Sequence, residues 1–290
     1  RLGIIIGVMD ATPLDESHAS IVRDFLFTDP VANVFLIGIM ERWGLAPTPS
    51  GSWWGCFASS GVLHSLVYAG PSDQFGRASI AVASGDPRSC VVLGEALLEH
   101  GGASWVIGEQ ASSDALWLGL GNPPARVQSD QTLMCATRAT PGRTLEIRDA
   151  QPSDLVWVLS ASSAMLKEDL GISEPQILPP HVAITGECVG LHEGERVFRA
   201  KLATSCSAGA QIGGIWVDPR HRHLGLGRAG TRGTIQPLLE THPRVTLHVR
   251  TDNRTAIRCY ESVGFAPVRA FRVMVRKVAA MGRRQAGPPI

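Results

Sequence analysis

Hydrophobic positions along the chain recur with two spacings. Apolar runs, or apolar residues alternating with polar ones, predict strands, and apolar residues three or four positions apart predict helices. In the first half these patterns give a strand, two helices, a strand meander, a helix, a strand, a helix and a strand. The ranges are, in that order, Leu2–Met9, Thr12–Leu26, Pro30–Trp43, Trp53–Ser59, Val62–Ala69, Ile80–Ala83, Arg88–His100, Trp105–Gly108, Ser113–Leu120 and Val127–Ala136.

The same order starts again after Thr140-Pro-Gly-Arg143, which has the composition of a linker. The second set of ranges is Leu145–Arg148, Pro152–Met165, His181–Gly190, Arg196–Thr204, Gln211–Val217, Ala229–Leu239, Val245–Val249, Asn253–Val263 and Pro267–Val275. We therefore expect an α/β chain of two tandem units, each a mixed α+β sheet flanked by helices. The expected boundaries are 1–139, a linker at 140–144, 145–278 and a tail at 279–290.

Composition limits the classes of function. The chain has 290 residues, 44% hydrophobic and 18% charged, which suits two folded domains. A net charge of +1 gives no overall attraction to nucleic acid, so no such partner is expected. No two of the six cysteines form a Cys-x-x-Cys pair, which argues against a metal site and favours free thiols in a cytoplasmic protein. The apolar run Leu2–Met9 is too short to cross a bilayer, so no membrane contact is expected.

A turn in the second half has the pattern of an anion site. The apolar run Ile215-Trp-Val217 predicts a strand, and Asp218-Pro219 ends it because proline cannot donate to a ladder. A basic turn with two glycines follows at Arg222–Arg228, and a helix begins after it. Unpaired backbone amides at such a place bind phosphate groups.

A second motif follows about 25 residues later, in the helix that holds Asn253, Ala256 and Tyr260 and ends at Gly264-Phe265. Together, in this order and with a strand between them, the two motifs resemble the GCN5-related N-acetyltransferase (GNAT) superfamily. The resemblance covers roughly Leu145–Val278. The tandem arrangement is also similar to an actinobacterial two-domain branch of that superfamily.

The resemblance implies a site for acetyl-CoA as co-substrate, without a metal. In the family, amides of the glycine turn hold the pyrophosphate, and the preceding strand splays from its neighbour to meet the pantetheine arm. An asparagine at the position of Asn253 bonds that arm, and a tyrosine at the position of Tyr260 protonates the leaving thiolate. The implied cofactor-binding residues are Ile215, Trp216, Val217, Arg222, His223, Leu224, Gly225, Leu226, Gly227, Arg228, Asn253, Ala256 and Tyr260.

The catalytic base is less specified by the sequence. His248 lies on the strand before the second motif, and its ordinary pKa near 6.5 suits a base. Glu168 and Asp169 are alternative carboxylates. A histidine packed on the sheet, solvated carboxylates and a chain of water molecules are the competing interpretations.

The first half departs from the family pattern. In place of a phosphate turn it has Ala83-Ser-Gly-Asp-Pro-Arg88, whose acidic residue repels phosphate and whose proline removes an amide. We expect this half to keep the fold without binding acyl-CoA. Three tryptophans, Trp43, Trp53 and Trp54, are either core residues or the lining of an acceptor pocket between the halves.

The sequence thus predicts an N-acyltransferase that moves an acetyl group from acetyl-CoA to a primary amine. The alternative is a non-catalytic acyl-CoA-binding regulatory module. A small molecule, a peptide and a protein all remain open as the acceptor, and the oligomeric state is open too.

Overall fold

The computed structural model describes residues 9–47, 51–71, 79–173 and 180–277. The strand predicted at Leu2–Met9, apart from Met9, and the tail at 279–290 lie outside these ranges. The first half contains β1 (Asp10–Leu14), η1 (Glu16–His18), α1 (Ala19–Leu26), α2 (Val34–Trp43), β2 (Ser52–Phe57), β3 (Leu63–Pro71), β4 (Ser79–Gly85), α3 (Pro87–Glu99), β5 (Trp105–Glu109), α4 (Gln110–Gly119) and β6 (Ala125–Ala136).

The second half repeats this order of helices and strands, with one extra short helix before α7. Its elements are β7 (Glu146–Asp149), η2 (Pro152–Asp154), α5 (Leu155–Leu170), α6 (Pro180–Ile184), β8 (Glu187–His192), β9 (Glu195–Cys206), β10 (Gly209–Val217), η3 (Pro219–His221), α7 (Leu226–Thr241), β11 (Val245–Arg250), α8 (Arg254–Glu261) and β12 (Ala266–Arg276). The fold is therefore a mixed α/β fold built from two tandem units with the same order of elements, as the sequence predicts.

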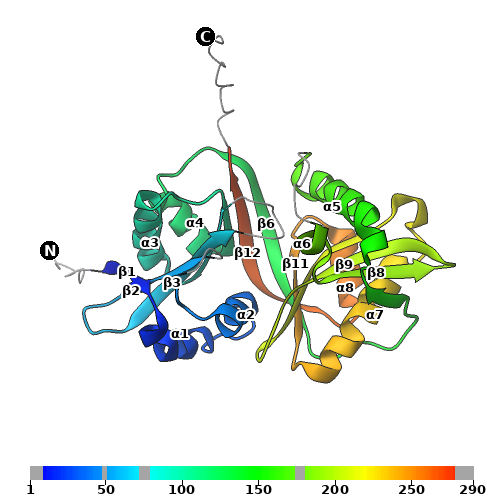
Figure 1. Cartoon of the computed structure of the whole chain (residues 1–290), viewed down its shortest axis with the longest axis horizontal. Coiled ribbons are helices and arrows are strands. Elements are labelled where there is room, and N and C mark those ends of the chain that lie inside the picture. The colour runs from blue at the N-terminus through cyan, green and yellow to red at the C-terminus, as the bar shows by residue number, and fades with distance from the viewer. Residues whose placement is uncertain (1–8, 48–50, 72–78, 174–179, 278–290) are drawn as a thin grey trace, which may run out of the picture.

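One mixed sheet of 12 strands runs through both halves in the order β1-β2-β3-β4-β5-β12-β6-β11-β10-β9-β8-β7. The last strand of each half lies in the other half. Strand β12 pairs antiparallel with β5, and β6 pairs antiparallel with β11. The two exchanged strands also pair with each other along the middle of the molecule (Figure 1). The backbone hydrogen bonds of these strands therefore join the halves into one sheet.

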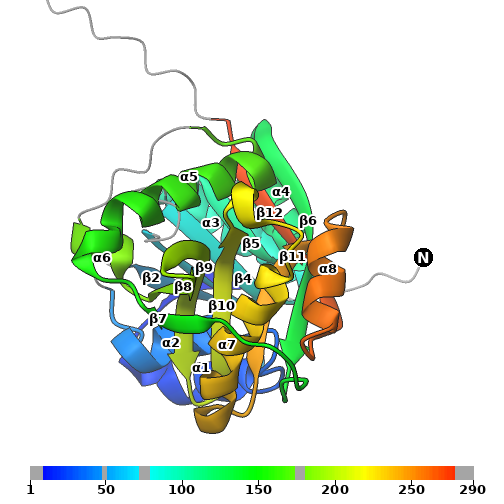
Figure 2. The same ribbon diagram turned by 90° about the vertical axis from the view of Figure 1, so that its right-hand side faces the viewer.

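Helices cover both faces of the sheet. In the first half, α1 and α2 pack on one face around Val22, Leu26 and Ile37, whereas α3 and α4 pack on the other around Leu93 and Leu116. In the second half, α7 and α8 cover one face, and α5 lies across the opposite one (Figure 2). Each half thus has a core on both sides of its strands.

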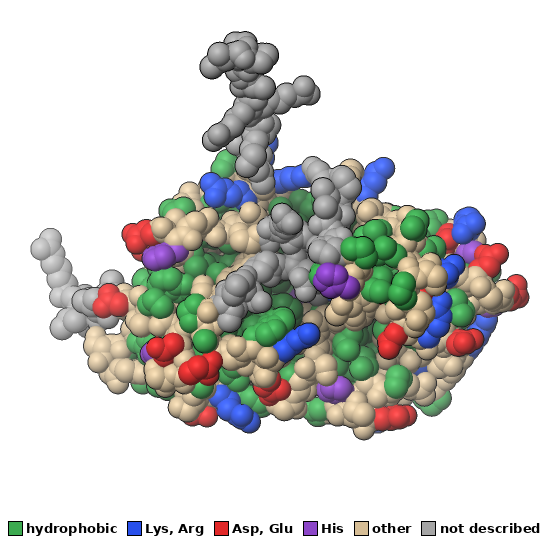
Figure 3. All heavy atoms as spheres, viewed as in Figure 1, with side chains coloured by type: hydrophobic (Ala, Val, Ile, Leu, Met, Phe, Trp, Pro, Cys, Tyr) green, Lys and Arg blue, Asp and Glu red, His purple; other side chains and the backbone are tan. Residues whose placement is uncertain are grey.

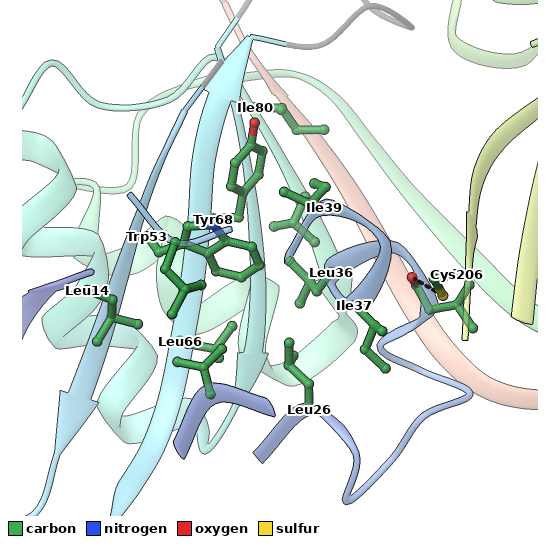
Figure 4. Close-up of a cluster of buried hydrophobic side chains, with 14 of the residues drawn as sticks. Leu14, Leu26, Leu36, Ile37, Ile39, Trp53, Leu66, Tyr68, Ile80 and Cys206 are labelled. Atoms are coloured by element: carbon green, nitrogen blue, oxygen red, sulfur yellow. Dashed lines mark hydrogen bonds between the residues drawn. The ribbon is translucent and has the colours of Figure 1, made fainter. Parts of the chain in front are cut away.

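Helix α2 of the first half also contacts the β9–β10 hairpin of the second half. A side chain at Gly38 would overlap Thr204, so the glycine permits close approach of helix and strand. The Cys206 thiol donates to the Val34 carbonyl at 3.5 Å, and Figure 4 shows Cys206 beside the buried cluster that contains α2. The carboxylate of Glu41 accepts hydrogen bonds from the backbone and hydroxyl of Ser207. These contacts fix one half against the other.

Two sequence predictions are wrong locally. The helix predicted from Thr12 begins later, because residues 10–14 form an edge strand paired with β2. An edge strand tolerates a proline such as Pro13, because such a strand pairs with a neighbour on one side only. The helix predicted at His181–Gly190 ends at Ile184, and residues 187–190 belong to β8, where pairing with β9 outweighs local helical spacing.

Separating the chain at the predicted linker tests the strand exchange. Fragments 1–139 and 140–290 each lose the partner of a central strand, and unpaired edges promote aggregation. We expect neither fragment alone to unfold cooperatively, whereas the two co-expressed fragments should form a 1:1 complex. Size-exclusion chromatography and circular dichroism during urea titration provide the measurement. A monomeric fragment that unfolds cooperatively would contradict the expectation and would make the boundary at 140–144 a true division of folding units.

Candidate active site

A gap in the sheet lies between β10 and β11. The two strands run parallel but pair only at Ala210↔Val245 and Gln211↔Thr246. After Gln211, β10 continues to Val217 beside β9 alone. The Val217 carbonyl accepts a hydrogen bond from Arg222 at 3.1 Å, and the other backbone groups of Ile215–Val217 that would face β11 are available to a ligand. This is the splayed strand that the resemblance implies.

A bulge turns the backbone of β10 at this gap. The register with β9 shifts between Gly213 and Trp216, and Gly214 has φ +59°, a conformation that glycine adopts without steric cost. The guanidinium of Arg199 donates to the Gly214 carbonyl at 3.0 Å. The same guanidinium forms two bonds with the Glu187 carboxylate, at 2.6 and 2.7 Å, and these side chains are only 5% and 2% exposed. A buried ion pair therefore holds the bulge in place.

The glycine turn after β10 ends in a helix start that no side chain caps. His223 and Gly225 both have left-handed backbones, with φ +66° and +74°, and Gly225 is the N-cap of α7. Within the described residues, the backbone amides of residues 223–228 have no recorded acceptor. Successive free amides at a helix N-terminus form a site for a phosphate group. Helix α7 starts three residues earlier than predicted, directly after this N-cap.

Arg222 is engaged within the protein. Its guanidinium donates to the Val217 carbonyl at 3.1 Å, pairs with Glu168 at 2.8 Å and lies 6.0 Å from the Trp216 ring. Arg222 thus ties the end of β10 to helix α5. Glu168, one of the proposed bases, has its charge compensated by this pair.

Helix α8 carries the second motif. The Asn253 side chain accepts a hydrogen bond from the Ala256 amide at 3.0 Å, so Asn253 is the N-cap of α8. Tyr260 lies two turns further on and is 8% exposed. Burial raises the pKa of Tyr260 well above that of a free phenol. The hydroxyl is therefore protonated at physiological pH, which is the form an acid catalyst requires.

His248 faces the same space from β11. Its ring centroid lies 4.5 Å from that of Phe271, a residue of the exchanged strand β12. Burial lowers the pKa of His248 to about 4, so the ring is neutral near pH 7 and binds a proton weakly. The third proposed base, Asp169, stands at the end of α5, where burial raises the pKa of its carboxyl.

These groups line one cavity of about 1020 Å³. Of the residues implied by the resemblance, all but Leu224 line it, and Leu224 is 56% exposed to solvent. His248, Glu168 and Asp169 line it as well. Sequence reasoning missed the pair Arg199–Glu187, because nothing in strand periodicity distinguishes a buried ion pair from two solvated charges.

The first half supplies the far wall of the cavity. Residues of α2, β4 and β5 contribute to it, among them Phe35, Val82 and Ile107. The tryptophans proposed for an acceptor pocket are not part of the lining. Trp53 is buried in the core of the first half, Trp54 packs on His100, and Trp43 is exposed.

The corresponding region of the first half is closed. Strands β4 and β5 pair through Ala83↔Gly108 near the end of β4, so no gap of the β10–β11 kind opens between them. The Asp86 carboxylate caps α3 by accepting the Ser89 amide at 3.0 Å, and Pro87 provides no N–H. The helix start that corresponds to the glycine turn of the second half is thus occupied by the protein's own carboxylate.

Comparisons with known proteins agree with this geometry. The comparison with curated proteins gave no match. Among solved structures, a Drosophila protein superposes with a TM-score of 0.60 at 12% identity, covering 91% of this chain and 98% of its own. A GCN5-related N-acetyltransferase from Sphaerobacter thermophilus gives 0.55 at 16% identity, covering 92% and 94%. A tandem GNAT protein from the clavulanic acid biosynthesis pathway gives 0.51 at 13% identity, covering 94% and 100%.

At these identities the structural likeness establishes the fold. In the described ranges, none of the helices combines the length and the apolar character that crossing a membrane requires. Residues 146–265 match the model of the acetyltransferase (GNAT) family. The second half of this chain, with its splayed strands and its glycine turn, is therefore a GNAT domain.

Proposed function

We propose that the protein transfers an acetyl group from acetyl-CoA to a primary amine. The observation that carries this proposal is the gap between β10 and β11, which leads to the free amides of residues 223–228 and to Tyr260 within one cavity. A slot for an extended arm, a phosphate site at one end and a phenol beside it match the parts of acetyl-CoA.

The residues fit the co-substrate part by part. The amides of residues 223–228 would hold the pyrophosphate, helped by the positive end of the α7 dipole. Arg228 stands on the first turn of α7 and adds a positive charge. The free edge of β10 at Ile215–Val217 would hydrogen-bond the amides of the pantetheine arm, and the bulge at Gly214 would face the thioester.

The chemistry requires a proton balance. Starting from an ammonium acceptor, a C–N bond forms, the C–S bond breaks, the nitrogen loses two protons and the sulfur gains one. Tyr260, protonated and inside the cavity, would donate to the sulfur as it leaves. Backbone N–H groups of the bulge would stabilise the negative charge that develops on the carbonyl oxygen.

The three proposed bases differ in suitability. Glu168 pairs with Arg222, and the lowered pKa of His248 makes its ring a weak base near neutral pH. Asp169 has a raised pKa, which brings a carboxylate closer to the range in which a base works best. These properties favour Asp169 over the other two.

We also propose that each chain has one acyl-CoA site. The closed β4–β5 pairing and the Asp86 cap in the first half support this. All six cysteines are free thiols, the form that a reducing cytoplasm maintains, which supports the proposed cytoplasmic location. The acceptor, small or macromolecular, is proposed as an amine.

Turnover distinguishes this function from an acyl-CoA-binding regulatory module. Purified protein, acetyl-CoA and a panel of primary amines are incubated, and the released thiol is measured. An enzyme releases thiol only when an amine is present. Binding of CoA without release of thiol on any amine would instead identify the regulatory module.

Replacing Tyr260 tests the proton donor. We expect Tyr260→Phe to lower kcat roughly 100-fold, because the leaving sulfur loses its acid, while the Kd for CoA is unchanged. Tyr68 is the other tyrosine of the chain, is buried in the first half and serves as the control, with kcat retained in Tyr68→Phe. An unchanged kcat in Tyr260→Phe would remove this residue from the mechanism.

Replacing Gly225 tests the phosphate turn. Ala at φ +74° is strained by about 1–2 kcal/mol, and relief of the strain moves the amides away from the pyrophosphate. Calorimetry should show one CoA per chain, with a Kd raised roughly tenfold in Gly225→Ala through weakened charge-assisted hydrogen bonds.

The matched control is Gly61→Ala, since Gly61 has φ +82° and also meets open space in the β2–β3 turn. It should lose similar stability and keep the wild-type Kd. Two CoA molecules per chain would contradict the single site, and equal Kd values in both variants would contradict the role of the turn.

The buried His248 should make stability depend on pH. Below about pH 6.5 the unfolded chain binds a proton at this residue, whereas the folded ring stays neutral down to about pH 4. As the pH is lowered across that interval, the free energy of unfolding should therefore fall by up to about 1.4 kcal/mol per pH unit. We expect His248→Phe to flatten this part of the profile, measured by urea unfolding between pH 4.5 and 7.5. The exposed His64, replaced in the same way, should leave the slope unchanged.

A further inference from the structure

The cavity extends well beyond the slot between β10 and β11. It continues along the sheet to the first half, where α2, β4, β5 and the exchanged strand β12 form its wall. The side chains that these elements contribute are mostly hydrocarbon. They include Phe35, Leu36, Val82, Ile107, Phe271 and Val273.

The polar groups of this wall bond to protein. The Asn33 amide donates to the Leu26 carbonyl at 3.0 Å, and its oxygen accepts the Ser84 hydroxyl at 2.8 Å. Glu109 pairs with Arg269 at 2.9 Å. A ligand in contact with this wall therefore finds little unused hydrogen-bonding capacity, and a polar ligand would leave its own groups unpaired at a cost.

The charged groups on the opposite side of the cavity are largely paired as well. Glu187 is bonded to Arg199, and Glu168 is bonded to Arg222. The Asp169 carboxylate is different, because within the described residues no hydrogen bond or ion pair to it is recorded, although it lines the cavity. Its backbone carbonyl accepts from Arg250 at 2.6 Å, which fixes the main chain there, while the Arg250 guanidinium pairs with Asp252. Asp169 is thus placed to receive a cation from the cavity.

We propose that the acceptor is a primary amine on a bulky apolar body, with its ammonium at Asp169 and its body against the wall that the first half supplies. The proposal deepens the acetyltransferase function given above and rests on it. The proposal also gives the first half a role. This half has no open site for acyl-CoA of its own, and it would select the acceptor of the second half. Figure 3 shows hydrophobic side chains reaching the surface near the middle of the molecule, where the two halves meet.

A series of acceptors tests the apolar wall. The probes are n-alkylamines from ethylamine to octylamine, 2-phenylethylamine, and the polar amines ethanolamine and glycinamide. We expect kcat/KM to rise roughly fourfold per methylene until the wall is covered, because each buried methylene contributes about 0.8 kcal/mol. Calorimetry of the same amines with the protein–CoA complex supplies a readout that does not depend on turnover.

Two phenylalanines provide matched variants. Phe35 and Phe57 are both half-buried and both pack against the core cluster of the first half, but only Phe35 lines the cavity. Phe35→Ala should weaken octylamine binding about tenfold or more through the lost contact. Phe57→Ala should not change it, and neither variant should change the Kd for CoA. Ile107→Thr, a smaller change in the same wall, covers the case in which Phe35→Ala does not fold.

Asp169→Asn tests the ammonium site. It should weaken octylamine binding and leave the binding of 1-octanol, which has the same body without a charge, unchanged. Equal loss for both ligands would show that Asp169 shapes the cavity rather than pairing with the amine, and would overturn this part of the proposal.

Failure of the acceptor proposal and failure of the acetyltransferase proposal would give different results. Turnover on polar amines without preference for apolar ones would overturn the acceptor proposal and leave the acetyltransferase function standing. Apolar amines that bind in a Phe35-dependent manner without any turnover would overturn the transferase function and leave the binding site standing.

Discussion

The separation of β10 from β11 is the constraint on which the rest of the site depends. Two parallel strands that pair at only two positions leave backbone groups exposed, and such groups need partners. On the β9 side, the bulge at Gly214 is held by Arg199, whose charge is balanced by Glu187 in the interior. A buried pair of this kind strongly resists removal of one partner, so it keeps the opened strand in one geometry. The gap remains available on the β11 side, and the glycine turn of residues 222–228 lies at its end.

The exchange of β6 and β12 determines what surrounds that gap. Strand β6 supplies the partner that β11 needs after it has parted from β10, and β12 places Phe271 beside His248. Because the exchanged strands pair with each other, the first half is held in a fixed position on the same sheet. Its helix α2 and strands β4 and β5 therefore form part of the cavity wall. A half whose own slot is closed by strand pairing and by Asp86 thus contributes to the site of the other half.

The sequence predicted correctly those features that depend on interactions between residues close together in the chain. Asn253 is an N-cap because its side chain reaches an amide three residues ahead, and Gly225 ends the turn because it adopts a positive φ without strain. The repeated order of strands and helices and the placement of Tyr260 two turns from Asn253 follow from periodicity alone. The local errors also have local causes, since a proline at Thr12-Pro13 suits an edge strand as well as a helix start.

Contacts between distant residues were decided by the tertiary structure. The exchange of the final strands depends on pairing across more than a hundred residues, which no spacing within one half reveals. Because Arg222 pairs with Glu168, neither charge is free to pair with a ligand. Burial changes the pKa values of His248, Asp169 and Tyr260. The sequence by itself determined the fold class, the glycine turn before α7 and the capped helix α8, because these follow from spacing and from hydrogen bonds within a few residues. Only the tertiary structure decided which charges are paired and which wall faces the gap between β10 and β11, because burial and pairing depend on how the two halves share one sheet.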